Sequence, residues 1–147
     1  MQVITEAPRP VPPAALAGKA RDTLHLTWEE RRWTRKRVTT AAGRELALAL
    51  PTGTVLDPGA VLLVEDDWYL VVEARPEPVL AIFPASREEA LRLAFEVGNR
   101  HFTLAVERDQ LLVPDDPAME QLLTRLGVAF ERTRAVFVPI GHGHRHD

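Results

Sequence analysis

Hydrophobic and polar residues alternate with a period of two along much of the first half of the chain. The clearest runs are residues 23–28 and 45–50, and this alternation is typical of strands that bury one face. Turn-forming glycine and proline interrupt the pattern at residues 51–53 and 57–59. No helical period appears before Pro84. We therefore predict a small all-β domain for this half.

The pattern becomes mixed after a proline-containing boundary at residues 75–78. A short apolar run follows, and Ser86 with Glu89 forms a capping box that predicts the start of a helix. Two more strands come next, then a second helix that Asp116 and Pro117 open, then a last strand. The order β-α-β-β-α-β is the ferredoxin-like arrangement.

These patterns predict an α+β protein in three parts. Residues 1–76 form the all-β domain, residues 77–140 the ferredoxin-like domain, and residues 141–147 a flexible tail that contains histidine. Four prolines between residues 8 and 13 also predict a loosely packed lead-in over residues 1–22. Because domains this small are marginally stable alone, we expect a homodimer.

Composition narrows the possible functions. The net charge is −3 and the isoelectric point about 6.0, so the chain has no global positive field for nucleic acid. No apolar run approaches the roughly 20 residues that cross a bilayer, and we expect a cytoplasmic protein without membrane contact. The absence of cysteine excludes disulfides, iron–sulfur clusters and thiolate zinc sites. Any metal must therefore be bound by imidazole, carboxylate, carbonyl or water.

Three of the five histidines lie in the last six residues, as His142, His144 and His146. Small or charged residues between the imidazoles cannot build a core, but such a segment can present several neutral nitrogen ligands. Imidazole suits zinc, copper, iron and nickel. An engineered purification tag is the alternative interpretation, although tags usually carry unbroken histidines.

Another histidine, His101, follows Gly98 and Asn99 where the first helix of the second half should end. Gly or Asn can adopt the left-handed conformation that stops a helix, which would fix the position of His101. The histidine could also be a simple cap or packing residue. One imidazole cannot make a useful metal site, but a symmetric dimer contact would supply two, and tail histidines could add more.

Residues 31–37 form the one basic cluster that includes an aromatic ring, Trp33. Three interpretations are open: a basic strand that binds RNA through phosphate contacts and stacking, solvated charges partly balanced by Glu29 and Glu30, or a docking surface for a protein partner. An RNA-associated assembly factor is thus the alternative function. The acidic isoelectric point argues against it.

We expect no enzymatic activity. The chain contains no nucleophile elbow, phosphate loop, HExxH helix or EF-hand pattern. The adjacent acids at residues 66–67 and 115–116 could be paired carboxylates, but adjacent acids in turns usually serve as turn formers and caps.

Several segments resemble the UreE family of urease accessory proteins, which are nickel metallochaperones. The tetrapeptide that ends at His101 is the most specific of them, and the likeness spans about residues 23–139. The matching segments are Gly98-Asn99-Arg100-His101, Leu126-Gly127, Phe137-Val138-Pro139 before a histidine tail, Thr34-Arg35-Lys36-Arg37, Gly43 and residues 46–53.

The resemblance implies a peptide-binding-like β domain, a ferredoxin-like metal domain and a homodimer that holds Ni2+ at its interface. His101 matches the family's interface ligand, and His142, His144 and His146 match the variable tail by type and place. Zn2+ or Cu2+ could replace nickel, because imidazole accepts all three. Some members have extra histidines around the segment that is 115–118 here, but this chain has none there, so we expect no secondary copper or zinc site.

The resemblance also implies partners. They are the urease maturation complex with its GTPase, and the urease apoprotein that receives the ion. Neither nucleic acid nor a membrane is among them.

Overall fold

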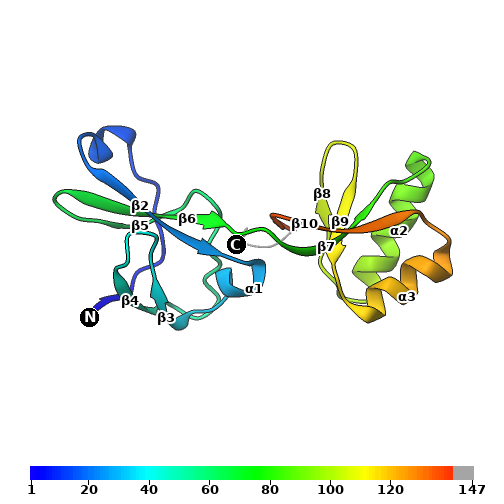
Figure 1. Ribbon diagram of the computed structural model, residues 1–147, viewed down its shortest axis with the longest axis horizontal. Coiled ribbons are helices and arrows are strands. Elements are labelled where there is room, and N and C mark those ends of the chain that lie inside the picture. Colours follow the sequence, from blue (N-terminus) through cyan, green and yellow to red (C-terminus); the bar gives the residue numbers. More distant parts are fainter. Residues whose placement is uncertain (141–147) are drawn as a thin grey trace. The chain divides into compact units, whose positions relative to one another are not determined.

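The computed structural model describes residues 1–140, which form two compact units (Figure 1). The N-terminal unit is Met1–Arg75 and the C-terminal unit begins at Pro76. The predicted α+β class is confirmed, with an all-β first part and a ferredoxin-like second part. The predicted tail, residues 141–147, lies outside the described residues.

Two three-stranded sheets make up the N-terminal unit, in the orders β1-β4-β3 and β2-β6-β5. Each sheet contains one parallel and one antiparallel pair. The elements are β1 (Gln2–Ile4), a 3-10 turn η1 (Pro13–Leu16), β2 (Ala20–Leu26), α1 (Trp28–Arg31), β3 (Arg35–Thr39), β4 (Glu45–Ala49), β5 (Val61–Val64) and β6 (Trp68–Ala74).

The alternating apolar residues of these strands form one core. Leu24 and Leu26 of β2 and Leu46 and Leu48 of β4 are buried in it, as the period-two pattern predicts. The lead-in differs from the prediction at its start. There, the three-residue strand β1 pairs in parallel with β4 and buries Ile4. The start of the lead-in is therefore part of the sheet.

The first residue of the predicted basic strand 31–37 belongs instead to the helix α1, which the period-two pattern did not reveal. The Thr27 hydroxyl accepts the Glu30 N–H at 3.3 Å, and the Glu30 carboxylate accepts the Thr27 N–H at 2.9 Å. This capping box starts a helix where alternation predicted a strand. Arg31 is consequently 1% exposed and donates to the Leu26 carbonyl, and β3 begins only at Arg35.

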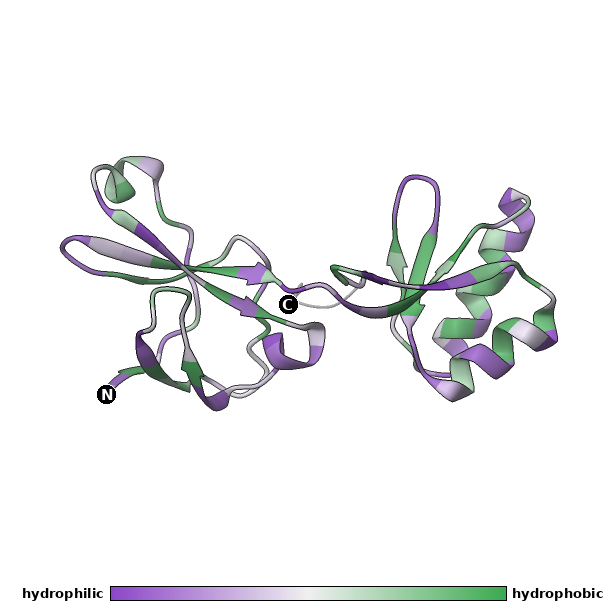
Figure 2. Cartoon of the chain, in the orientation of Figure 1, coloured by the Kyte–Doolittle hydropathy of each residue, from purple (hydrophilic) through white to green (hydrophobic). Residues whose placement is uncertain are grey.

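The C-terminal unit has the predicted ferredoxin-like topology. Its antiparallel sheet has the order β10-β7-β9-β8. The interior strand β9 is hydrophobic, whereas the edge strand β10 is largely polar (Figure 2). The elements are β7 (Glu77–Ile82), α2 (Arg87–Asn99), β8 (Ala105–Val106), β9 (Leu111–Pro114), α3 (Pro117–Leu126) and β10 (Phe130–Ala135).

Both helices pack on the sheet through a shared apolar cluster. Leu93 and Val97 of α2 join Met119 of α3 there, against Leu80 and Ile82 of β7. None of the helices in residues 1–140 combines the length and the apolar character that a bilayer crossing requires.

The predicted starts of both helices and the predicted end of α3 are confirmed. Ser86 accepts the Glu89 N–H at 3.1 Å at the start of α2, and Asp116 accepts the Ala118 N–H at 2.8 Å at the start of α3. Gly127 ends α3 with a φ of 71°, where the missing Cβ avoids strain.

The segment after β10 returns to the start of β8. Phe137 is 1% exposed, and the Ile140 N–H donates to the Leu104 carbonyl at 2.9 Å. The last described residue is therefore fixed beside the connection from α2 to β8.

Candidate functional site

His101 occupies the turn that ends α2. Its N–H donates to the Gly98 carbonyl at 2.9 Å, and the Phe102 N–H donates to the Val97 carbonyl at 3.1 Å. These two bonds define a Schellman motif, in which His101 holds the position that glycine usually occupies. Phe102 and Val97 also share the apolar cluster of the unit, as the motif normally requires.

The backbone of His101 is strained. Its φ is 63°, and among residues 1–140 it is the one non-glycine residue with a positive φ. The sequence suggested that Gly98 or Asn99 would take the left-handed conformation, but both lie within α2. The left-handed residue lies two or three positions later than that expectation, so the histidine itself adopts the unfavourable conformation.

The imidazole of His101 is available to a ligand. The residue is exposed, and within the described chain its side chain forms no hydrogen bond or ion pair. The described residues also contain no group of three or more histidine or acidic side chains that could hold a metal ion. A metal at His101 would therefore need ligands from outside residues 1–140 of one chain.

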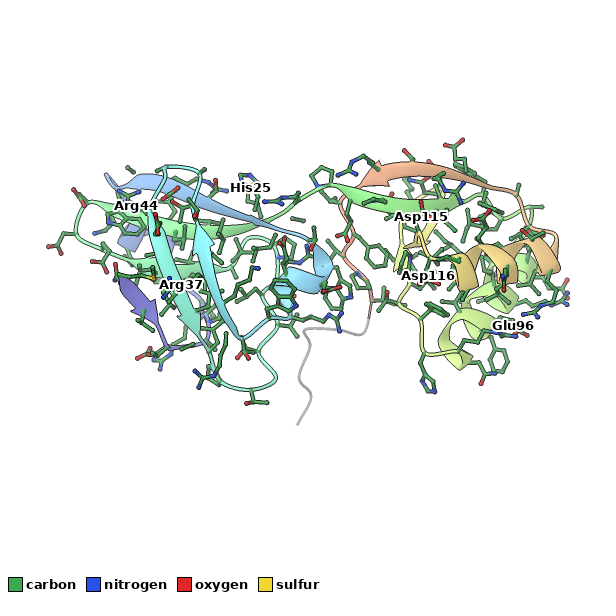
Figure 3. The ribbon with its side chains drawn as sticks, turned by 60° about the horizontal axis from the view of Figure 1, so that its bottom comes forward. His25, Arg37, Arg44, Glu96, Asp115 and Asp116 are labelled. Atoms are coloured by element: carbon green, nitrogen blue, oxygen red, sulfur yellow. The ribbon has the colours of Figure 1, made fainter. Side chains whose placement is uncertain are left out.

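The outer face of α2 carries an unusual pair of apolar side chains. Leu91 is 60% exposed and Phe95 is 68% exposed, and the two are one helical turn apart. Asn99 continues the same spacing, directly before the turn that holds His101. The adjacent Arg100 is paired with Glu96, which Figure 3 labels on this helix.

The tail histidines His142, His144 and His146 lie outside the described residues. His25 is described and lies on β2, where its Nε2 is 4.0 Å from a Glu73 carboxylate oxygen that faces solvent. Because Glu73 also pairs with Arg21, this histidine belongs to a surface charge cluster. His25 belongs to the N-terminal unit and His101 to the C-terminal unit, so neither unit contains both histidines.

The adjacent acids have structural partners (Figure 3). Asp115 accepts the Nε–H of Arg132 at 3.0 Å, and Asp116 caps α3. The backbone carbonyls of Asp66 and Asp67 accept hydrogen bonds from Lys19 and Ala20. These pairs act as turn and cap residues, as expected.

The basic cluster 31–37 is not one uniform surface. Arg31 is buried, the Arg32 guanidinium stacks 5.0 Å from the Trp28 ring, and the Lys36 ammonium lies 3.8 Å from the Trp33 ring. Arg35 and Arg37 remain exposed on β3.

One buried carboxylate, that of Asp22, was not predicted from the sequence. Asp22 is 3% exposed and accepts the Thr23 and Ala42 N–H groups and the Arg44 guanidinium, at 2.8, 3.0 and 2.8 Å. Burial alone raises the pKa of Asp22, but hydrogen bonds from Thr40, Ala42, Arg44 and Thr23 outweigh it and lower the pKa below its ordinary value. The sequence does indicate that Asp22 is buried, because it alternates with Leu24 and Leu26 and therefore lies on the same face of the strand.

Comparisons with known proteins cover nearly the whole chain. The model of the UreE urease accessory protein N-terminal domain matches residues 4–75, and that of its C-terminal domain matches residues 77–147. The chain is 39% identical over 145 residues to the urease accessory protein UreE of Deinococcus radiodurans, a match that covers 93% of this chain and 94% of that protein.

Two further relatives carry the same name. The urease accessory protein UreE of Ralstonia nicotianae is 40% identical over 143 residues, covering 95% of this chain and 68% of that protein. Its namesake from a Synechococcus species is 40% identical over 124 residues, covering 82% and 83%. The resemblance drawn from the motifs is thereby confirmed, and the chain belongs to the UreE family of urease accessory proteins.

Proposed function

We propose that this protein is a nickel-binding metallochaperone that delivers Ni2+ during assembly of the urease active site. In this proposal the ion is cargo, held at the interface of a homodimer and released without chemical turnover. Membership in a family of urease accessory proteins supports the maturation role.

The observation that carries the proposal is the strained backbone of His101. The left-handed conformation costs an L-residue about 1–2 kcal/mol, which glycine avoids. Within residues 1–140 no hydrogen bond or ion pair of the imidazole offsets this cost. Packing of Val97 and Phe102 fixes the turn, but it would do the same with glycine at position 101; a strained residue that glycine could replace is often functional, so we infer that the imidazole serves as a metal ligand.

In a dimer, two His101 imidazoles would be available to one ion. An isologous contact near His101 brings the same residue from both copies to the axis. The exposed pair Leu91 and Phe95 supports such a contact, because it lies on the helix that ends at His101 and would lose its solvent exposure against a second copy.

The tail starts close enough to contribute ligands. Ile140 is bonded to Leu104, which is three residues beyond His101 in the chain. An extended chain advances about 3.5 Å per residue, so His144 and His146 can reach the imidazole of their own subunit. Two copies of His101 with tail imidazoles would suit Ni2+, and Zn2+ and Cu2+ would compete for the same nitrogens.

The mechanism follows from these ligands. The tail histidines capture the ion, the two His101 side chains seat it, and a partner with competing ligands removes it. We propose that this partner is the urease maturation complex with its GTPase, which passes the ion to the urease apoprotein. Each imidazole must be neutral to bind, so protons compete with the metal.

Equilibrium dialysis with Ni2+ tests the proposal. His101→Ala should lose the tightest site, whereas the matched control His25→Ala should bind like wild type, because His25 lies in the other unit beside Glu73. Equal nickel binding by wild type and His101→Ala would refute the interface site.

A further inference from the structure

Residues 136–140, the five residues after β10, connect the two edges of the C-terminal sheet. β10 and β8 are the outer strands of this sheet, and the Ile140 N–H donates to the carbonyl of Leu104, directly before β8, at 2.9 Å. Three spacings between neighbouring strands amount to about 14 Å, and five extended residues reach about 17 Å. Residues 136–140, which we call the strap, therefore take a nearly straight path across one face of the sheet.

The strap crosses the face opposite the helices. Leu80 and Ile82 of β7 face α2 and α3 in the apolar cluster of the unit, so the residues that alternate with them point to the other face. The inner residues of that other face are almost fully buried as well, namely Val79, Ala81, Ala105 and Leu112. The strap accounts for their burial, because it crosses the sheet on this side.

The side chains of the strap alternate between the sheet and solvent. Phe137 and Pro139 are buried. The other three side chains are 42%, 47% and 56% exposed, in the order Val136, Val138 and Ile140. This alternation is that of an extended chain with one side against a sheet. Because burial of an aromatic ring contributes more than one hydrogen bond at the surface, Phe137 is the principal anchor of the strap.

We propose that Phe137 is a positioning residue for the metal site, because it docks the strap and so fixes where the tail histidines begin. This inference rests on the nickel-carrier function proposed above. With the strap docked, the tail starts at Ile140, which is bonded to Leu104, three residues after His101. With the strap released, the last fixed residue would be Ala135, at the end of β10 on the opposite edge of the sheet.

Release of the strap would lengthen the chain between the tail ligands and their fixed origin. His142 lies two residues beyond Ile140 but seven beyond Ala135, and His144 lies four and nine residues beyond them. The effective concentration of a ligand on a flexible chain falls roughly as the −3/2 power of the chain length, so it would fall about three- to sevenfold at His101. Nickel should still bind at the two His101 side chains, but more weakly by about this factor.

The test compares Phe137→Ala in two full-length backgrounds by calorimetric titration with Ni2+. In the wild-type background, Phe137→Ala should weaken nickel binding about three- to sevenfold. In the triple variant His142→Ala/His144→Ala/His146→Ala it should have no further effect, because no tail imidazole is left to position. A merely structural role of Phe137 would weaken binding equally in both backgrounds.

Two variants of the strap serve as controls. Val138→Ala changes an exposed side chain of the same segment and should bind nickel like wild type. Phe137→Leu keeps part of the apolar burial and should give an intermediate loss, which tests the proposal even if Phe137→Ala does not fold.

Amide hydrogen exchange without metal observes the strap directly. The Ile140 amide should be protected in wild type and in Val138→Ala, and should exchange faster in Phe137→Ala. Faster exchange with unchanged nickel affinity, or equal losses in the two backgrounds, would overturn the positioning role and leave the nickel carrier intact. Equal nickel binding by wild type and His101→Ala would instead refute the proposed function, and this role of Phe137 with it.

Discussion

Replacing His101 with glycine should stabilise the C-terminal unit while it abolishes tight nickel binding. Most substitutions of a ligand are neutral or destabilising, so this combination is diagnostic. It follows from the position of His101 in the Schellman turn, where φ is 63° and where glycine is the residue without strain.

The expected change in the free energy of unfolding is the sum of two opposing effects. Relief of the left-handed strain contributes about 1–2 kcal/mol, and the greater freedom of glycine in the unfolded chain removes about 0.5–1 kcal/mol. The net gain therefore lies between about 0 and 1.5 kcal/mol, and its central value of about 0.7 kcal/mol raises the unfolding midpoint of a domain this small by a few degrees. His101→Ala keeps the strained backbone, so it should lose nickel without the gain in stability.

The assay can observe the two units separately. Trp28, Trp33 and Trp68 all lie in the N-terminal unit, whereas the long helices α2 and α3 lie in the C-terminal unit. In urea with a chelator present, far-UV circular dichroism should show the stabilised C-terminal unit, and tryptophan fluorescence should show an unchanged N-terminal unit. If His101→Gly lowers the stability of the C-terminal unit, the imidazole has a stabilising role and the strain argument is wrong.

Three further outcomes are expected. Asp22→Asn should destabilise the N-terminal unit by about 2 kcal/mol in urea at neutral pH, because it weakens the ion pair between the buried Asp22 carboxylate and the partly exposed Arg44 guanidinium. Since the folded pKa of Asp22 lies below its ordinary value of 3.8, the wild type should lose this advantage as pH falls through the folded pKa; a difference that persists in strong acid would contradict the ion-pair explanation. Phe95→Ser should shift sedimentation toward monomer and weaken nickel binding, with the exposed Val106→Ser as control; an unchanged dimer would exclude this face. Deleting residues 141–147 should lower the number of nickel ions bound and leave the tightest site; loss of that site would instead make the tail its main ligand source.

The ferredoxin-like unit was predictable because its signals are local and agree with one another. The caps at Ser86 and Asp116 and the stop at Gly127 each fix one end of a helix. The N-terminal unit was predictable only as a class. Helix α1 is a four-residue helix within an alternating run, and β1 depends on a parallel pairing with β4 that no local pattern encodes.

The backbone conformation of the candidate ligand His101 was not predictable from the sequence, and its role as a metal ligand stays a prediction. The residues around His101 pointed to a metal ligand through family resemblance, while the Gly98-Asn99 pair suggested an earlier helix end. Whether a helix stops at glycine or continues past it depends on tertiary packing. Here Val97 is fully buried and Phe102 packs on the same cluster, which places the turn beyond Asn99 and leaves the histidine in the glycine position.

The environment of His101 suits a carrier better than a resident metal centre. Its backbone is fixed by the two bonds of the turn, yet within the described chain the ring donates to no carboxylate or carbonyl. Metal-bound histidines normally have such a partner, and its removal weakens metal binding about 10–100-fold. A ligand with a fixed backbone and an unsupported ring can find the ion reproducibly and still release it when a partner competes. In the nickel-carrier proposal, this one turn would therefore both seat the ion and allow its release.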